Sequence, residues 1–277
     1  MSRTRCFPAL FLLLIGVTVV PPMNGQELGE IGVPAASASL DLSGVWAMIQ
    51  IASEIMQIPI VGERTRTTAT YLRLTIDQSG ATLAILETHC ATNIDDGTMM
   101  VNTTIPDAFL RSLSVTERVA RLELASDASQ STDDRSSNPR IVFPWATQVL
   151  GARLRDPENE ALPTDVADPR VFDQDSDGHA GMTVQVEIMG LIRGEVYVVQ
   201  RNRNRLVGTV VSPGFIKGTI EWETEQVVLG ASSSFLESAG QGIPDPDPER
   251  NFFLAKRIDP ILDCIDIQQM DLLLLGD

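Results

Sequence analysis

Three aspartates at alternate positions give this chain its most specific chemistry. Asp173, Asp175 and Asp177 are followed directly by Gly178 and His179. In calcium loops of the EF-hand type, positions 1, 3 and 5 supply side-chain oxygens, position 6 is a glycine that permits a sharp turn, and position 7 offers its backbone carbonyl. Oxygen ligands favour calcium over zinc, which prefers histidine and cysteine. The sequence therefore predicts a calcium site in which His179 contributes its backbone carbonyl.

The sequence leaves the remaining ligands of this ion open. An EF-hand closes its coordination with a glutamate at position 12, but Val184 stands there. Other oxygens must then complete the shell, and the sequence offers Asp165, Asp168, Glu187 or water. We expect a weak site, with a dissociation constant of about 10⁻⁴ to 10⁻³ M, that pins a long loop onto a sheet. The alternative is a solvated acidic loop without an ion, in which the carboxylates repel one another.

Residues 173–181 resemble the aspartate loops of thrombospondin type 3, dockerin and integrin-propeller repeats. The resemblance covers only this loop, and it implies calcium bound through the alternating aspartates. The loop differs from the propeller type at position 9, where Gly181 replaces the usual aspartate.

The N-terminus is typical of an export signal. Arg3 and Arg5 precede an apolar run at residues 9–20 that is shorter than the roughly 20 residues of a membrane-spanning helix. We predict a signal peptide at residues 1–25, a linker at 26–39 and a periplasmic or extracellular mature chain without a membrane span. An uncleaved anchor is the alternative.

Two cysteines remain after the predicted signal peptide, since Cys6 lies within it. Cys90 and Cys264 form an even pair in an oxidising compartment, which predicts one disulfide. Two buried free thiols are the alternative interpretation.

The rest of the chain has mainly the two-residue period of strands. Alternation at residues 70–77 and 82–88 predicts a hairpin, and residues 106–113 are the one stretch that favours a helix. After the acidic loop we predict a meander of four strands at residues 183–188, 196–200, 206–211 and 215–229, with one of its turns at 202–204. The predicted fold is a mainly β protein: an antiparallel meander forming a barrel or sandwich, in a single domain at residues 40–277 with its calcium-binding loop at 165–181.

Two charged clusters lie within this meander. Glu221, Glu223 and Glu225 alternate on one strand face, which we expect to be solvated while Trp222 points inward. Arginines gather at the predicted turn and are expected to be solvated or paired with nearby acids: Arg201, Arg203 and Arg205.

Gly44, Val45 and Trp46, at the start of the predicted β domain, resemble the Gly-x-Trp opening of lipocalins and related calycin barrels. The resemblance implies a tryptophan packed across the closed bottom of a barrel and a small apolar ligand held inside. A disulfide from Cys90 to the C-terminal segment at Cys264 would also be similar to that family. The other interpretation of Trp46 is an ordinary core aromatic residue.

Motifs of the common enzyme classes are missing from the sequence. It contains no Gly-x-Ser-x-Gly elbow, no glycine-rich phosphate loop and no zinc-ligand spacing, and His89 and His179 are its only histidines. A formal net charge of −16 argues against nucleic acid and anionic membranes as partners. We therefore expect a non-catalytic binding or structural module of the bacterial envelope, with an envelope component or a small apolar ligand as partner. The alternatives are a lipocalin-like carrier and a secreted hydrolase that uses two carboxylates.

Overall fold

The computed structural model describes residues 40–58, 61–124, 138–237 and 242–273, and the described residues belong to one compact unit. The predicted signal peptide and linker lie outside these residues. Among the described helices, none combines the length and the apolar character needed to cross a membrane.

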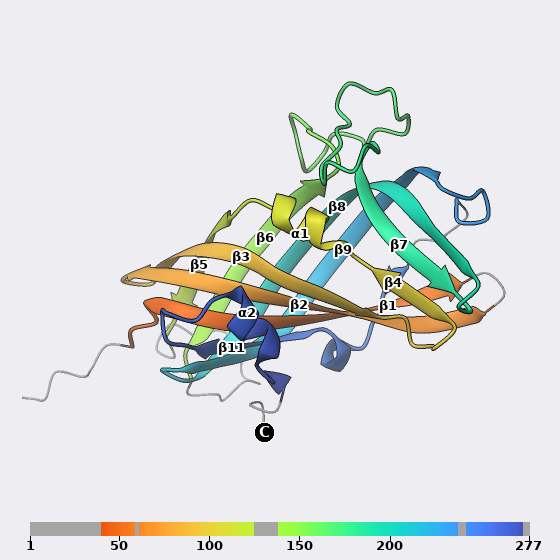
Figure 1. Ribbon diagram of the computed structural model, residues 1–277. Coiled ribbons are helices and arrows are strands. Elements are labelled where there is room, and N and C mark those ends of the chain that lie inside the picture. Colours follow the sequence, from red (N-terminus) through yellow and green to blue (C-terminus); the bar gives the residue numbers. More distant parts are fainter. Residues whose placement is uncertain (1–39, 59–60, 125–137, 238–241, 274–277) are drawn as a thin grey trace, which may run out of the picture. The chain divides into compact units, whose positions relative to one another are not determined.

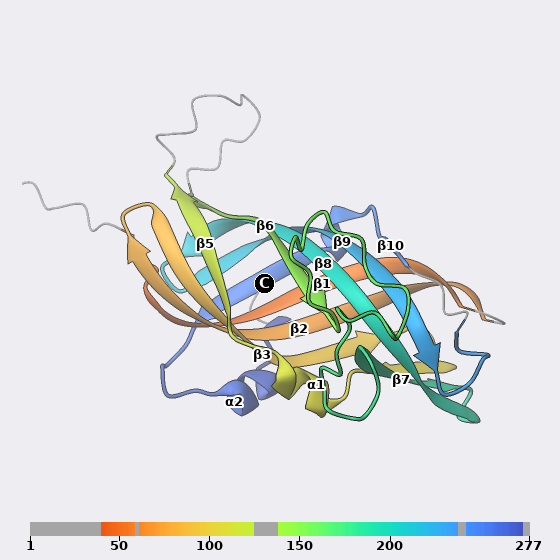
Figure 2. The same cartoon turned by 90° about the horizontal axis from the view of Figure 1, so that it is seen from above.

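Eight antiparallel strands form a closed ring (Figures 1 and 2). Each pairs with the next of the eight along the chain, and the last pairs with the first. The strands are β1 (Gly44–Ile58), β2 (Gly62–Ser79), β3 (Thr82–Asp95), β5 (Thr116–Glu123), β6 (Arg140–Leu150), β8 (Ile192–Ser212), β9 (Phe215–Ala231) and β11 (Phe252–Arg257). An even number of alternating strands makes the closing pair antiparallel, so the ring removes the edges of the sheet. The predicted mainly β, antiparallel fold is confirmed.

Shorter elements extend this ring. Strand β7 (Met182–Ile188) pairs with β8, β4 (Val101–Thr104) pairs with β7, and β10 (Ile243–Pro244) pairs with β1. Within the described residues, two α-helices and one 3₁₀ helix complete the fold: α1 (Asp107–Ser112), α2 (Cys264–Gln269) and η1 (Pro248–Arg250). Helix α1 lies within the stretch that the sequence favoured as helical, with Pro106 as its N-cap.

The predicted turn at residues 202–204 is wrong, because β8 runs unbroken from Ile192 to Ser212. Three strands, β7, β8 and β9, therefore replace the four that were expected. The arginines lie on this strand and form cross-strand ion pairs, at 2.8, 3.2 and 3.6 Å, with the glutamates of β9: Arg201–Glu225, Arg203–Glu223 and Arg205–Glu221. Polar residues continue through β8 because one face makes these pairs while the other faces the interior of the barrel.

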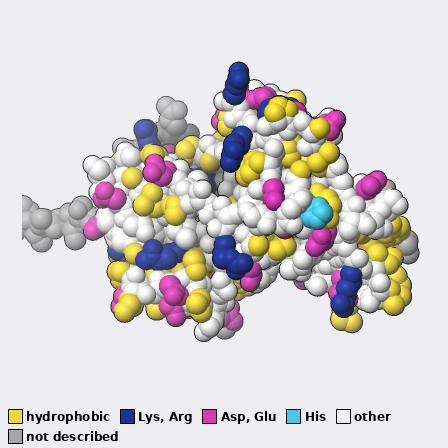
Figure 3. All heavy atoms as spheres, turned by 45° about the horizontal axis from the view of Figure 1, so that its top comes forward, with side chains coloured by type: hydrophobic (Ala, Val, Ile, Leu, Met, Phe, Trp, Pro, Cys, Tyr) yellow, Lys and Arg dark blue, Asp and Glu magenta, His cyan; other side chains and the backbone are white. Residues whose placement is uncertain are grey.

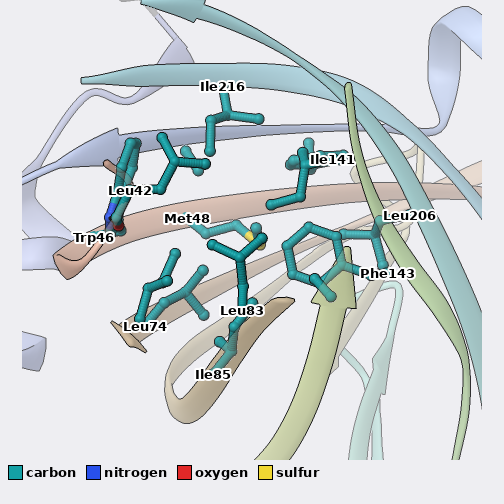
Figure 4. Packing of buried hydrophobic residues seen from close by; sticks show 14 of the residues in the cluster. Leu42, Trp46, Met48, Leu74, Leu83, Ile85, Ile141, Phe143, Leu206 and Ile216 are labelled. Atoms are coloured by element: carbon teal, nitrogen blue, oxygen red, sulfur yellow. Dashed lines mark hydrogen bonds between the residues drawn. The ribbon is translucent and has the colours of Figure 1, made fainter. Parts of the chain in front are cut away.

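A buried apolar cluster, here called the base cluster, fills one end of the barrel (Figure 4). Trp46, Leu83, Ile141 and Leu206 in this cluster have no exposed surface. Its other buried members are Leu42, Met48, Leu72, Leu74, Ile76, Ile85, Ala120, Leu122, Phe143, Val210, Ile216, Ile220, Phe253 and Ala255. Burial of this apolar surface closes one end of the ring and provides the main stabilising contribution.

Contacts at the packed end of the barrel explain the Gly-x-Trp sequence. The Trp46 indole nitrogen donates to the Leu42 carbonyl at 2.9 Å, and the Arg257 guanidinium lies 4.9 Å from the centre of the Trp46 ring. Arg257 also donates to the Ser43 and Asp41 carbonyls. Gly44 has φ +129°, and a Cβ there would lie 2.9 Å from an Arg257 nitrogen. Glycine is therefore required for both the backbone angle and the close approach of Arg257.

A second cluster covers the outer side of the same end. The predicted disulfide is confirmed, and it joins Cys90 of β3 to Cys264 at the start of α2. On the outer face of β1, Val45, Ala47 and Ile49 pack with Ile267 of α2 and with further apolar residues. The first half of β1 is thus buried on both faces, which explains its continuous apolar sequence.

Candidate functional site: an aspartate loop and a polar barrel interior

Backbone contacts fix both ends of the aspartate loop. The Gln174 amide donates to the Gly181 carbonyl at 3.0 Å, and the Gly181 amide donates to the Phe172 carbonyl at 2.9 Å. The Gln174 side chain accepts a hydrogen bond from the Gly151 amide at 2.6 Å. The loop leads directly into β7, so the pairing of β7 with β8 holds the C-terminal end of the loop in position.

The three predicted carboxylates converge. One oxygen each from Asp173, Asp175 and Asp177 lies within 4.8 Å of the others, so the cluster could hold a metal ion. The Asp173 carboxylate also accepts the Gly178 amide at 2.9 Å. Gly178 has φ +92°, an angle that favours glycine and lets the loop turn around the carboxylates.

Asp175 is the buried member of the cluster, with 7% of its surface exposed. Its Oδ2 accepts the Thr183 amide at 3.1 Å, but its Oδ1 is buried and makes no hydrogen bond within the described part of the chain. Burial raises the pKa of Asp175 and the nearby Asp177 and Asp173 charges raise it further, while the Thr183 amide lowers it. A buried oxygen without a partner is destabilising, and a bound cation would supply that partner.

The residues considered as further ligands have other partners. Asp168 pairs with Arg170 at 2.6 Å, and Glu187 pairs with Arg193 at 3.0 Å. Asp165 accepts the Ala167 amide at 2.8 Å. The His179 ring stacks on Tyr197 with the ring centres 4.0 Å apart. The three aspartates therefore form the core of the candidate metal site.

A cavity of about 290 Å³ lies inside the barrel beyond the base cluster. It adjoins a second space of about 240 Å³ that reaches Phe109 and Leu110 of α1, and both spaces share His89, Gln200 and Asn202 among their lining residues. Seven strands of the ring contribute to the wall of the first cavity: β1, β2, β3, β5, β6, β8 and β9. The interior of the barrel thus changes from packed to open along its length.

The wall of this cavity is rich in hydrogen-bonding side chains. Strand alternation points Gln200, Asn202 and Asn204 of β8 into the barrel. Gln200 donates to Asn202 at 2.6 Å and to Thr224 of β9 at 3.1 Å. Trp222 lines the wall as predicted, and its indole nitrogen donates to the Asn251 side chain at 2.8 Å. We call the inward residues Gln200, Asn202 and Asn204, together with the cavity-lining side chains that face them across the barrel, the polar layer.

Carboxylates in the polar layer are paired with arginines. Glu87 lies 3.6 Å from Arg118, and Glu54 lies 3.3 Å from Arg66. Burial raises the pKa of both glutamates, and the neighbouring guanidinium groups oppose that shift. Burial also lowers the pKa of His89 to about 4, so its imidazole is neutral at pH 7. Each inward carboxylate therefore has a guanidinium partner, whose positive charge compensates the negative charge of the carboxylate.

The outer surface differs from this wall in its charge distribution. On the face drawn in Figure 3, acidic and basic side chains are interspersed with apolar ones. The net negative charge of the sequence therefore does not gather into a continuous acidic surface on that face.

Sequence reasoning found the aspartate loop and Trp222 but missed the polar layer. A signal was present: β8 carries polar residues at every position from Gln200 to Arg205, which leaves no apolar face for a packed core. In a strand, such a run indicates a wall with hydrogen-bonding groups on both sides. Asparagine is also common in turns, and residues 202–204 were therefore predicted to form a turn.

The comparisons add no relative to this description: no family model matches the chain, and no curated protein or solved structure is significantly similar to it.

Proposed function

We propose that this chain is an exported, calcium-stabilised β barrel that acts as a non-catalytic binding module of the bacterial envelope or extracellular space. Its ligand is a small molecule held inside the barrel. The interior cavity of about 290 Å³ carries the proposal, because it lies at the lower end of the size range of ligand pockets and is bounded by a rigid ring of strands. The cavity supports a carrier-like binding role over a purely structural one.

Calcium has a defined role in this proposal. Asp173, Asp175 and Asp177, with the His179 carbonyl, would hold the ion and fasten the long loop before β7. Support comes from the Asp175 oxygen that makes no hydrogen bond within the described residues. The disulfide between Cys90 and Cys264 supports export, because disulfides persist in oxidising compartments.

A carboxylate-dependent hydrolase is the second candidate. One observation favours it: Glu54 and Glu87 line the same cavity, and burial raises the pKa of both. Their pairing with Arg66 and Arg118 supports a binding role instead, because an adjacent guanidinium favours the ionised carboxylate, which has no proton to donate. Turnover of 4-nitrophenyl glycosides by the protein, and its loss in Glu87→Gln, would decide for the hydrolase.

A reachable interior is the first requirement of the binding function, and thiol labelling tests it. Ala52 lines the cavity, whereas Ala120 lies in the base cluster with 1% of its surface exposed. We expect methyl methanethiosulfonate to modify Ala52→Cys in the folded protein and to spare Ala120→Cys until the protein unfolds, as measured by intact mass. An unreactive Ala52→Cys would refute a ligand site inside the barrel.

A further inference from the structure

Two buried acceptor atoms of the cavity wall, Asn204 Oδ1 and Glu87 Oε1, make no hydrogen bond within the described part of the chain, although Glu87 Oε1 lies 3.6 Å from Arg118 at an ion-pair distance. They lie on β8 and β3, which are separated in the ring by β5 and β6. An unsatisfied buried polar group costs about 1–3 kcal/mol. A ligand that brings hydrogen-bond donors to two separate parts of the wall would remove this cost.

The charges of the wall favour a neutral ligand. The inward carboxylates of Glu87 and Glu54 already have guanidinium partners in Arg118 and Arg66. A charged ligand would either compete with these pairs or leave one charge uncompensated in a partly desolvated space, and both are unfavourable. A neutral molecule with several hydroxyl groups can donate hydrogen bonds to Asn204 Oδ1 and Glu87 Oε1 without replacing either guanidinium.

Trp222 adds an apolar surface to this polar wall. Its bond to Asn251 holds the indole nitrogen in place, so the ring forms a fixed part of the cavity wall. Sugars combine a face of C–H groups with a rim of hydroxyls, which matches one aromatic surface surrounded by hydrogen-bonding groups. A purely apolar ligand, as the lipocalin resemblance implies, would cover Asn204 and Glu87 without satisfying them.

Size limits the ligand further. A cavity of about 290 Å³ corresponds to roughly ten water molecules at about 30 Å³ each. One six-membered ring with its hydroxyls, and a few retained waters, fit this space.

We propose that the barrel binds a neutral polyhydroxylated molecule of about monosaccharide size, which packs on Trp222 and donates hydrogen bonds to Asn204 and Glu87. This inference rests on the proposed binding function and specifies its ligand class.

Saturation-transfer NMR on the mature, calcium-loaded protein tests this ligand class. D-glucose, D-galactose, D-mannose and myo-inositol serve as separate probes, with toluene as the neutral apolar probe and glucose 6-phosphate as the charged one. We expect transfer to at least one neutral probe and at least about a tenfold loss of its affinity in Asn204→Leu, equivalent to one lost hydrogen bond. Glu87→Gln provides a second variant, and Glu221→Gln, which changes an exposed residue of β9, is expected to bind as the unmodified chain does.

The outcomes separate the two proposals. Transfer to none of the four neutral probes, transfer to toluene alone, or binding that both interior variants leave unchanged would overturn the ligand class. If Ala52→Cys is nevertheless labelled in the folded protein, a reachable site inside the barrel survives and only its ligand is wrong. If Ala52→Cys stays unreactive, the binding function itself fails.

Discussion

The two halves of the barrel interior use the same strands for different purposes. Along β8, Leu206 is fully buried in the base cluster, whereas Asn204 and Asn202 on the same face line the cavity. Along β2, Leu72 is followed towards the cavity by Thr70 and Thr68. The same strands continue through both halves, with irregularities in register in the β2–β3 and β6–β8 pairs, and their inward side chains change from apolar to polar. The base cluster supplies stability, and the polar layer gives up some of that stability for a site.

Loss of the disulfide should have the largest effect on the free energy of unfolding. The bridge between Cys90 and Cys264 closes a loop with a sequence separation of 174 residues. In the chain-entropy model such a crosslink contributes about 5 kcal/mol. We expect the double variant Cys90→Ser/Cys264→Ser to lose about that much free energy of unfolding in urea titrations. A loss below about 1 kcal/mol would mean that helix α2 holds its place without the bridge.

A matched pair on β8 tests the division between the halves directly. Leu206→Ala removes a fully buried side chain from the base cluster, and such changes cost about 2–5 kcal/mol. Asn204→Ala, one layer away on the same face, removes an acceptor that has no partner within the described residues and should cost less than about 1 kcal/mol. Denaturant unfolding of both variants measures the contrast. Equal losses would show that the polar layer is part of the core.

The contrast between the halves also explains what the sequence could predict. Hairpin β2–β3 and strand β9 were predicted because one face of each is apolar and the period of two is visible. Strand β6 was missed because Pro144 interrupts it at an irregularity in register between Phe143 and Ala146. Asn202 and Asn204 were assigned to a turn because polarity was taken as exposure. In a barrel with an open interior, polarity also marks the inner wall.

The candidate site divides in the same way. Alternating aspartates and a glycine within one loop are local, so the sequence alone identified them. The polar layer gathers side chains from β1, β2, β3, β8 and β9, and only the closure of the ring brings them together. The register that places Glu87 opposite Leu74 and Asn204 opposite Trp222 is set within two hairpins, but these hairpins lie far apart in the sequence and enclose one cavity only through the other pairings of the ring.

His89 should make the polar layer sensitive to acid. Burial lowers its pKa from 6.5 to about 4, so the unfolded chain binds a proton in this range that the folded chain does not. Stability contributed by the neutral imidazole is therefore complete above about pH 6.5 and decreases as the pH falls towards 4, by up to about 3 kcal/mol. Urea titrations between pH 4 and 7 measure the change.

His89→Gln is the control for this effect, because it removes the titrating group and keeps a hydrogen-bonding side chain. Glu54 and Glu87 titrate with raised pKa values in the same layer and contribute in the opposite direction, so only the difference between the two proteins is informative. A difference that does not change with pH would show that His89 is protonated as easily in the folded chain as in the unfolded one.

Calcium should have the smallest effect on stability, and it should act on the aspartate loop, outside the base cluster. With a dissociation constant near 10⁻³ M, 10 mM calcium stabilises the folded state by about 1.4 kcal/mol, or roughly 3–5 °C in melting temperature. We expect this gain to disappear in Asp175→Asn and to persist in Glu158→Ala, which removes an exposed acid elsewhere in the same long loop. Differential scanning calorimetry with and without calcium measures both, and an equal gain in all three proteins would exclude the aspartate cluster as the site.

The calcium-free state of the same variant gives the sharper result. Asp175 buries an oxygen that makes no hydrogen bond within the described residues, next to two further carboxylates. Replacing it with asparagine removes a charge that only a cation would compensate, so without calcium Asp175→Asn should melt at or above the temperature of the unmodified chain. A lower melting temperature would mean that the carboxylate stabilises the loop by itself through the Thr183 amide. The loop would then be a structural acidic turn without a bound ion. The open end of the barrel would still differ from the stable base, but calcium would have no part in that difference.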